Sequence, residues 1–226
     1  DPRGIYFSER PLAREGKVAF LFAGQGSQYV NMLGDLAVNF VEVREQFERA
    51  DRALKGILPK PLSAYIFPPP SFSLEEEQDR REALTQTNVA QPAIGAADLA
   101  VFHLMGRLGV HPDFVAGHSY GECVALCAAG VFREDELFAL SEARGRFMVE
   151  AAGDEPGMMA AVDEGPDAVQ QVLGGVQGVV VANYNAPKQT IISGSRPAVE
   201  AAIEEFKKIG LRARPIPVAC AFHSAI

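Results

Sequence analysis

The sequence has little of several features that mark other classes of protein. Its three cysteines (Cys123, Cys127 and Cys220) give neither an even disulfide framework nor a metal-type pairing with histidines, so a reducing compartment is expected. It has no apolar run near the ~18 residues of a membrane span, and no signal segment opens it. These absences predict a cytoplasmic protein that binds neither a membrane nor a metal ion.

Length and charge narrow the class further. The 226 residues are 48% hydrophobic and 22% charged, which is ordinary globular composition with enough apolar material for one or two domains. A net charge of −8 argues against nucleic-acid binding as the main role. Because the chain opens with Asp1 rather than methionine, we expect it to be a piece of a longer protein.

The first two thirds of the chain alternate short apolar runs with helical patterns. The run at 17–22 (KVAFLF) is typical of a buried parallel strand, and 114–117 predicts a second strand. Apolar spacing, capping residues and good helix formers predict helices at 35–55, 73–82, 93–108, 122–129 and 134–151. The proline-rich stretch at 59–70 is expected to be loop.

After residue 153 the pattern changes to short strands and helices. We expect strands at 158–162, 178–183, 189–193 and 212–218, with helices at 167–173 and 197–209. This β-α-β-β-α-β order is that of a ferredoxin-like unit. The prediction is an α/β fold. A linker (1–16) precedes the first part of a large parallel-sheet, α/β-hydrolase-like subdomain (17–152), which carries an inserted small ferredoxin-like subdomain (153–218) and resumes at 219–226.

The most informative stretch is Gly-His-Ser-Tyr-Gly at 117–121, between an expected strand and an expected helix. Small residues at its two ends let the backbone turn sharply and expose the Ser119 hydroxyl at the helix start. There the helix dipole and nearby amides can hold an oxyanion. An ordinary turn with an N-cap serine fits the pentapeptide equally well.

A second glycine-containing loop, Ala-Gly-Gln-Gly-Ser-Gln at 23–28, follows the first strand. It lacks the Gly-Lys-Ser/Thr of a phosphate loop and the third glycine of a dinucleotide motif, which argues against a nucleotide site. Its glycines allow close approach of the backbone to a ligand, with an amide directed into a cleft.

Three separated segments together resemble one family. Phe-Ala-Gly-Gln-Gly-Ser-Gln at 22–28, Gly-His-Ser-Tyr-Gly-Glu at 117–122 and Ala-Phe-His-Ser at 221–224 closely resemble malonyl-CoA:acyl carrier protein transacylases and the acyltransferase domains of type I polyketide and fatty acid synthases. The likeness runs from about Lys17 to the C-terminus. It implies a malonyltransferase that uses malonyl-CoA and a phosphopantetheinylated acyl carrier protein, without a bound cofactor and beside neighbouring synthase domains.

The resemblance also implies roles for individual residues. Ser119 would be the nucleophile and His223 the general acid–base, in a two-step transfer through an oxyester. The backbone amides of Gln25 and Tyr120 would form the oxyanion hole. Arg144 would bind the free malonyl carboxylate through its guanidinium fork. For His223 the alternative is a partly buried structural histidine, and for Arg144 a solvent-facing position on its helix.

Substrate contacts are also implied for Gln91 and Phe222, although plain structural hydrogen bonding is as good an account of Gln91. In the family, a phenylalanine directly before the active-site histidine accompanies selection of malonyl groups, because a bulky ring crowds an α-methyl group. Here the stretch is Cys-Ala-Phe-His at 220–223, which departs from the family at its first position. The tyrosine that follows the proposed nucleophile, Tyr120, resembles the residue at this position in iterative synthases of the enediyne or polyunsaturated-fatty-acid type. The family continues beyond its histidine and there supplies the carbonyl that orients the imidazole.

Two other functions compete with this interpretation. A serine hydrolase of the α/β-hydrolase type shares Gly-x-Ser-x-Gly, but orders its triad as Ser, acid, His. A non-catalytic module could instead dock a carrier protein, through a basic patch comprising Lys207, Lys208, Arg212 and Arg214. A buried Arg144 would favour the transferase, since it would hold an acyl carboxylate rather than admit water.

Overall fold

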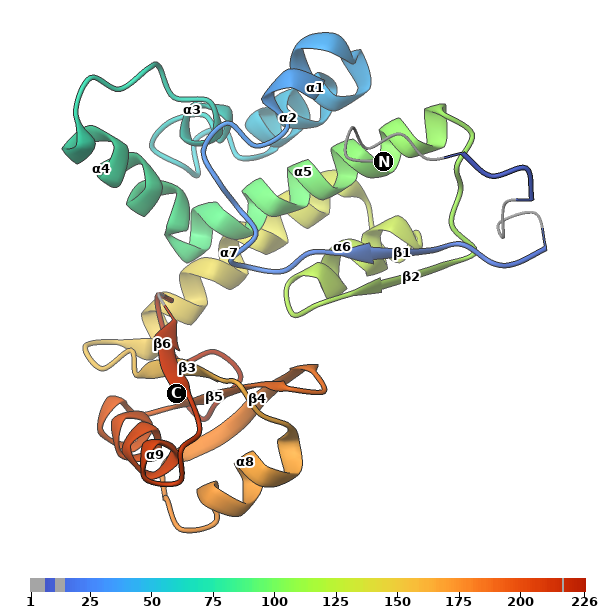
Figure 1. Cartoon of the computed structure of the whole chain (residues 1–226). Helices are drawn as coiled ribbons and strands as arrows, with labels where there is room; N and C mark the ends of the chain where they lie inside the picture. Colours follow the sequence, from blue (N-terminus) through green and yellow to red (C-terminus); the bar gives the residue numbers. More distant parts are fainter. Residues whose placement is uncertain (1–6, 11–14, 217) are drawn as a thin grey trace. The chain divides into compact units, whose positions relative to one another are not determined.

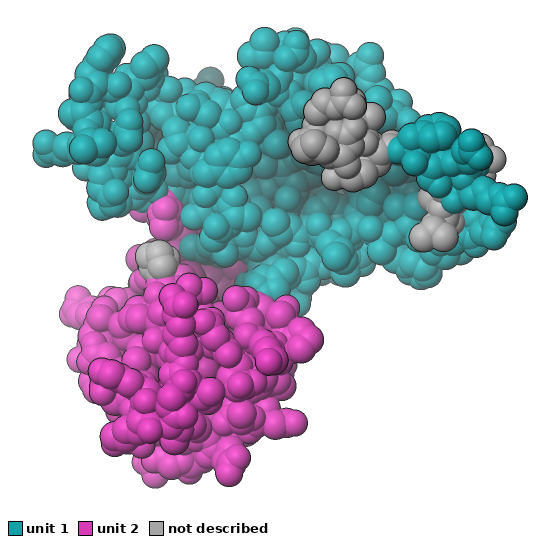
Figure 2. All heavy atoms as spheres, in the orientation of Figure 1, with its two compact units in different colours: residues 1–84, 91–141 teal, residues 85–90, 142–226 magenta. Residues whose placement is uncertain are grey.

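The computed structural model describes residues 7–10, 15–216 and 218–226, and it divides into two compact units (Figures 1 and 2). The first unit comprises residues 1–84 and 91–141, and the second comprises 85–90 and 142–226. The division falls within one helix, α7 (Glu134–Ala152). The subdomain boundary expected between residues 152 and 153 therefore stays a prediction, and part of the expected linker lies outside the described residues.

Up to α7 the chain is mostly helical around one pair of strands. Its elements in order are β1 (Ala19–Phe22), α1 (Gly34–Asn39), α2 (Val41–Ala53), α3 (Ser63–Ile66), α4 (Leu74–Thr85), α5 (Thr87–Arg107), β2 (Phe114–Gly117) and α6 (Gly121–Ala128). Strands β1 and β2 are parallel neighbours (Figure 1) and pair from Ala19 opposite Phe114 to Phe22 opposite Gly117. Both strands end at the same edge, where the glycine-containing loops begin.

Three expected elements differ in the structure. The helix expected at 35–55 is broken into α1 and α2, because Phe40 adopts extended dihedral angles (φ −123°, ψ 121°). The stretch at 59–70, expected to be loop, contains the short helix α3. Helix α5 begins at Thr87 rather than at residue 93 and therefore contains Pro92. Proline has no backbone N–H, which made it look like a helix boundary, but the helix accommodates it in its second turn.

Helix α5 is long and apolar enough to cross a membrane by length and composition alone. However, 61% of its most apolar window is buried inside the structure, and residues such as Ile94 and Leu99 are almost completely covered. This burial is that of a core helix, which passes the same test as a membrane span.

The second unit contains a four-stranded antiparallel sheet with two helices. After α7 the elements are β3 (Met158–Val162), α8 (Pro166–Leu173), β4 (Val179–Ala186), β5 (Gln189–Gly194), α9 (Arg196–Lys208) and β6 (Ala213–Ile216), and the strand order is β4-β5-β3-β6. Each expected strand and helix is present. The last strand ends at Ile216 rather than 218, and residue 217 lies outside the described residues.

The inner strands of this sheet, β3 and β5, are buried on both faces. Ala160 and Val162 of β3 point to the face covered by α8 and α9, where Phe206 is completely buried. Met159 and Ala161, the alternate residues of β3, point to the opposite face, against which Phe222 packs. The segment preceding His223 is therefore anchored to the second face of the sheet.

Candidate active site

Ser119 lies in a sharp turn between β2 and α6, and its φ of +53° is in the left-handed region. Non-glycine residues rarely adopt this conformation, and it persists where the surrounding structure enforces it. The flanking glycines show that enforcement: a Cβ on Gly117 would clash with the Gly121 backbone, and a Cβ on Gly121 would clash with the Phe22 carbonyl oxygen. The strand–turn–helix context expected for the serine is confirmed.

The loop after β1 packs directly against this turn. The His118 amide donates a hydrogen bond to the Phe22 carbonyl (3.1 Å), and a Cβ on Gly24 would clash with the His118 carbonyl oxygen. Gln25, the next residue, accepts a hydrogen bond through Oε1 from Nε2 of the buried Gln91 (3.3 Å). The structure thus brings together the loop of Gln25, the turn of Ser119 and the side chain of Gln91.

The Tyr120 side chain is completely buried. Its hydroxyl lies 2.6 Å from Ser141 Oγ, which donates to the Leu137 carbonyl of the same helix (2.6 Å). Since Ser141 uses its own proton on Leu137, Tyr120 is the donor in the Tyr120–Ser141 hydrogen bond. Sequence reasoning missed Ser141, because a serine within a helix carries no signal that it bonds a distant tyrosine.

Sequence reasoning also missed Asp98, on α5. Its carboxylate accepts a hydrogen bond from the Ala23 amide in the loop after β1, which favours the charged form. Burial outweighs this bond and raises the pKa of Asp98 to about 7. A polar residue in a long apolar helix was the available signal, since a buried carboxyl needs a partner.

Arg144 and its neighbours belong to the second unit. Gly145 allows α7 to pack tightly on the start of α5, since a Cβ on Gly145 would lie only 2.5 Å from Asn88 Cα. Arg144, the preceding residue, is half-buried. Arg146 lies farther out and pairs with the buried Glu142 (3.3 Å). The charges at 142–146 are thus divided between the Glu142–Arg146 ion pair and Arg144.

His223 lies in a tight turn, with φ of +56°. The Ala221 amide donates to the Pro156 carbonyl (2.6 Å), and the Ser224 hydroxyl donates to the Ala221 carbonyl (2.6 Å). His223 itself is exposed, whereas Phe222 packs on the sheet. His223 and Phe222, like Arg144, belong to the second unit, whereas the Ser119 turn belongs to the first.

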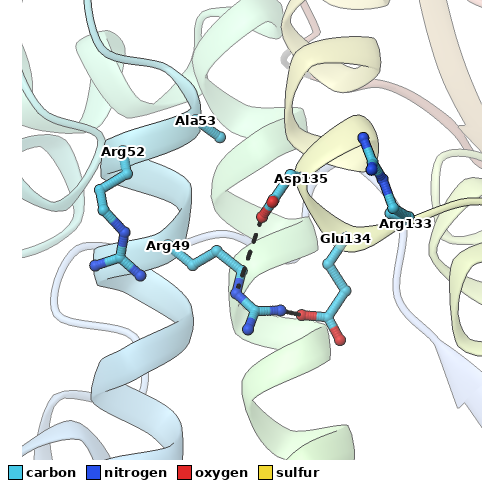
Figure 3. Close-up of a pocket in the computed structure, with 6 residues that line it drawn as sticks. All are labelled: Arg49, Arg52, Ala53, Arg133, Glu134 and Asp135. Carbon is cyan, nitrogen blue, oxygen red and sulfur yellow. Dashed lines mark hydrogen bonds and ion pairs between the residues drawn. The ribbon is translucent and has the colours of Figure 1, made fainter.

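A separate hollow of about 570 Å³ is lined by arginines and acids of α2 and the start of α7 (Figure 3). Arg49 forms ion pairs with Glu134 and, at 3.9 Å, with Asp135. Glu134 also lies 2.6 Å from Nε2 of His103, and that hydrogen bond is the main reason why the pKa of Glu134 is lowered. Because these charges compensate one another, we assign the hollow a structural role that ties three helices together.

The cysteines are free thiols. Burial raises the pKa of Cys220 and, with Glu134 and Glu136 adding to it, raises that of Cys127 to about 11. Both thiols therefore stay protonated near neutral pH and are poor nucleophiles. Within residues 7–10, 15–216 and 218–226, the structure contains no cluster of three or more His, Cys, Asp or Glu side chains that could hold a metal ion.

The class of the protein follows from this geometry. A serine held in the left-handed conformation between a strand and a helix is typical of the nucleophile elbow found in α/β serine enzymes. The family follows from the sequence as a whole. The chain matches the acyl transferase domain family over residues 19–226 and belongs to it.

Individual relatives cover nearly all of the chain. It is 39% identical to the malonyl CoA-acyl carrier protein transacylase of Bacillus subtilis, over 93% of the chain and 64% of the relative. It is 36% identical to one of the subunits of the polyunsaturated fatty acid synthase of Thraustochytrium, over 98% of the chain and 8% of the relative. The crystal structure of the malonyl CoA-acyl carrier protein transacylase from Clostridium perfringens matches with a TM-score of 0.80 at 34% identity, over 93% of the chain and 63% of that protein. The chain thus spans less than two thirds of each.

Proposed function

We propose that this chain loads a malonyl group from malonyl-CoA onto the phosphopantetheine thiol of an acyl carrier protein. The observation that carries the proposal is the left-handed Ser119 in a turn packed against the Gln25 loop, in a chain of the acyl transferase family. The names of two relatives, malonyl CoA-acyl carrier protein transacylases, support this choice of substrates. Family membership favours transfer over the hydrolase alternative.

The reaction would proceed in two balanced halves. Ser119 Oγ attacks the thioester carbonyl while His223 takes the hydroxyl proton, and the oxyanion is held by the amides of Gln25 and Tyr120. The C–S bond then breaks, and the CoA thiolate leaves with the proton from His223. In the second half, the carrier thiol gives its proton to His223 and attacks the malonyl ester, and the proton returns to Ser119. The reaction consumes no oxidant and requires no cofactor.

Two further side chains would select the acyl group. The fork of Arg144 would bind the malonyl carboxylate bidentately, which neutral acyl groups cannot satisfy. Phe222, held on the sheet by Met159 and its neighbours, would crowd an α-methyl group, an effect worth about 1–3 kcal/mol. Gln91 would contribute indirectly, because its hydrogen bond goes to Gln25.

The surroundings of this chain are also part of the proposal. We place it in the cytoplasm, within an iterative polyketide or polyunsaturated fatty acid synthase, beside neighbouring synthase domains. Similarity to the Thraustochytrium synthase supports that setting. The expected basic docking patch is weaker than its sequence implies, because each of its four cations has an acidic partner. If transfer kinetics are unchanged in Lys207→Glu with Lys208→Glu, the patch has no docking role.

The architecture fits the same proposal. The β-α-β-β-α-β order and the β4-β5-β3-β6 sheet support a ferredoxin-like subdomain at 153–218. The parallel β1–β2 pair supports assignment of 17–152 to a larger α/β-hydrolase-like subdomain, to which 219–226 would return.

Intact-protein mass spectrometry after brief incubation with malonyl-CoA tests the chemistry. We expect a malonyl-sized mass increase that is absent from the Ser119→Ala variant. Release of free CoA with no adduct would indicate a hydrolase instead. If neither adduct nor turnover were observed, the chain would be either a damaged fragment or a docking module, and the proposed function would be withdrawn.

Arg144→Ala tests the carboxylate contact. Loss of a bidentate pair should lower malonyl loading by about 100-fold, while loading of acetyl groups is unchanged or improved. Arg146→Ala, on the same helix and paired with Glu142, is the matched control and should leave the malonyl preference intact. An unchanged preference in Arg144→Ala would remove this residue from the site.

A further inference from the structure

One face of α5 contacts the residues around both proposed oxyanion amides. Gln91, Gly95 and Asp98 are spaced four and three residues apart, so they lie along one side of the helix. Gln91 bonds Gln25, and Asp98 accepts from Ala23. Between them, Gly95 faces the hydroxyl group of Tyr120.

The contact at Gly95 leaves no room for a side chain. A Cβ at this position would clash with the Tyr120 hydroxyl oxygen, yet it would lie 3.5 Å from Tyr120 Cζ and 3.6 Å from Leu137 Cδ2. The last two are ordinary van der Waals distances. The clash therefore comes from one atom, the hydroxyl oxygen, and a phenylalanine at residue 120 would avoid it.

The hydroxyl cannot easily move elsewhere. It donates to Ser141 Oγ at 2.6 Å, and Ser141 is itself tied to the Leu137 carbonyl. Tyr120 is completely buried and Ser141 is 1% exposed, so a displaced hydroxyl would lose its partner without reaching water. The ring is thus confined between α5 and α7.

Confinement of the ring also confines the backbone of Tyr120. This residue is the N-cap of α6 and directly follows the left-handed Ser119, and its carbonyl accepts from the Cys123 amide (2.9 Å). Because α5 and α7 confine the ring, a group that pushes on the hydroxyl strains the link from the ring to the Tyr120 Cα and amide. Oxyanion donors act through preorganised geometry, and a small displacement is costly.

We propose that Gly95 and Ser141 are positioning residues that fix the Tyr120 amide as an oxyanion donor through the Tyr120 ring. The assignment rests on the proposed function, in which that amide binds the oxyanion. Gly95 provides the space, Ser141 provides the hydrogen-bond acceptor, and neither contacts the substrate.

Gly95→Ala and Tyr120→Phe, alone and combined, test the proposal in the full-length protein by steady-state malonyl transfer. Gly95→Ala should lower kcat by about 10- to 100-fold with little change in KM, as for a misplaced oxyanion donor. Tyr120→Phe should cost less than about fivefold, because Ser141 keeps its bond to Leu137. The double variant should return to within about threefold of Tyr120→Phe, because the clashing atom is gone.

Gly106→Ala is the matched control. It lies on the same helix, where a Cβ would meet His111 at an ordinary 3.6 Å, so kcat should be unchanged. If Gly95→Ala behaves like Gly106→Ala, or if Tyr120→Phe fails to rescue it, the proposal is wrong. A malonyl adduct on wild-type Ser119 together with such a result would overturn the positioning role alone, whereas absence of the adduct would overturn the proposed function.

Ser141→Ala keeps the proposal testable if Gly95→Ala does not fold. It removes the acceptor without adding bulk and leaves the Tyr120 hydroxyl buried without that partner. We expect kcat to fall about three- to tenfold with KM unchanged. Tyr120→Phe in this background should have no further effect, and an unchanged kcat in folded Ser141→Ala would contradict the proposal.

Discussion

The inner strands β3 and β5 of the second unit are buried on both faces, whereas both strands of the β1–β2 pair in the first unit expose large apolar side chains. Leu21 is 80% exposed and Phe114 is 62% exposed. In β3, by contrast, every residue from Met159 to Val162 is buried. An apolar strand sequence is therefore buried at β3, whereas the apolar sequences of β1 and β2 are partly exposed.

The two units also hold their candidate site residues in position in different ways. The second unit positions its Phe222 turn by packing side chains on a sheet. The first unit positions Ser119 by close backbone contacts at Gly24, Gly117 and Gly121, where no side chain fits. Variants that remove packing on the sheet should therefore disturb the Phe222 turn, whereas variants that add a side chain at these glycines should disturb the Ser119 turn.

The largest effect is expected in the core of the second unit. Phe206→Ala removes a completely buried ring from α9 and should cost about 3–5 kcal/mol of unfolding free energy. Phe72→Ala, in which the lost ring is 94% exposed, should change stability by less than about 0.5 kcal/mol. Chemical denaturation measures both. Equal effects would contradict the assigned core.

A smaller effect, dependent on pH, is expected at Asp98. The folded-state pKa of about 7 lies above the usual value near 4. The stability contributed by the protonated form is therefore complete below pH ~4 and is lost as pH rises through ~7. Relative to Asp98→Asn, the wild type should lose on the order of 2–4 kcal/mol across this window.

Denaturation at several pH values measures that difference, and Asp113→Asn provides a control of opposite sign. The hydrogen bond from Lys17 lowers the pKa of Asp113, so its contribution to stability should be lost as pH falls. A difference between wild type and Asp98→Asn that does not vary with pH would show that Asp98 does not titrate in this range.

The smallest effect is expected at helix caps. The Ser73 hydroxyl accepts from the Glu76 amide (3.1 Å) at the start of α4, so Ser73→Ala should cost about 1 kcal/mol. Ser195, the N-cap of α9, makes no side-chain cap bond within the described structure, so Ser195→Ala should cost less. Thermal unfolding compares the two. A larger loss for Ser195→Ala would reverse the assignment.

How much was predictable depended on whether a feature was local. Short apolar runs and helical spacing located the strands and helices of the second unit, because both faces of β3 and one face of each helix are apolar. The break at Phe40 was not predictable, because the spacing of apolar residues continues through it. The predicted start of α5 was wrong because of Pro92: proline disfavours a helix interior, but tertiary packing outweighed that local preference.

The same limit applies to the candidate site. The turn around Ser119 could be predicted because a pentapeptide encodes it. The Tyr120–Ser141 hydrogen bond, the space at Gly95 and the Ala23–Asp98 contact join residues far apart in sequence. Such contacts depend on how helices pack, which no single stretch of sequence specifies.

The pairing of β1 with β2 has a consequence for folding kinetics. Phe22 pairs with Gly117 across all of α1 to α5, whereas Ala186 and Gln189 pair across a short turn. Closure of the long connection costs chain entropy before any strand contact compensates for it, so pairings of this kind form slowly. During synthesis β1 must wait for most of the first unit to emerge before its partner exists. We therefore expect the β4–β5 hairpin to form rapidly once synthesised, and the turn that holds Ser119 to be completed among the late steps of folding.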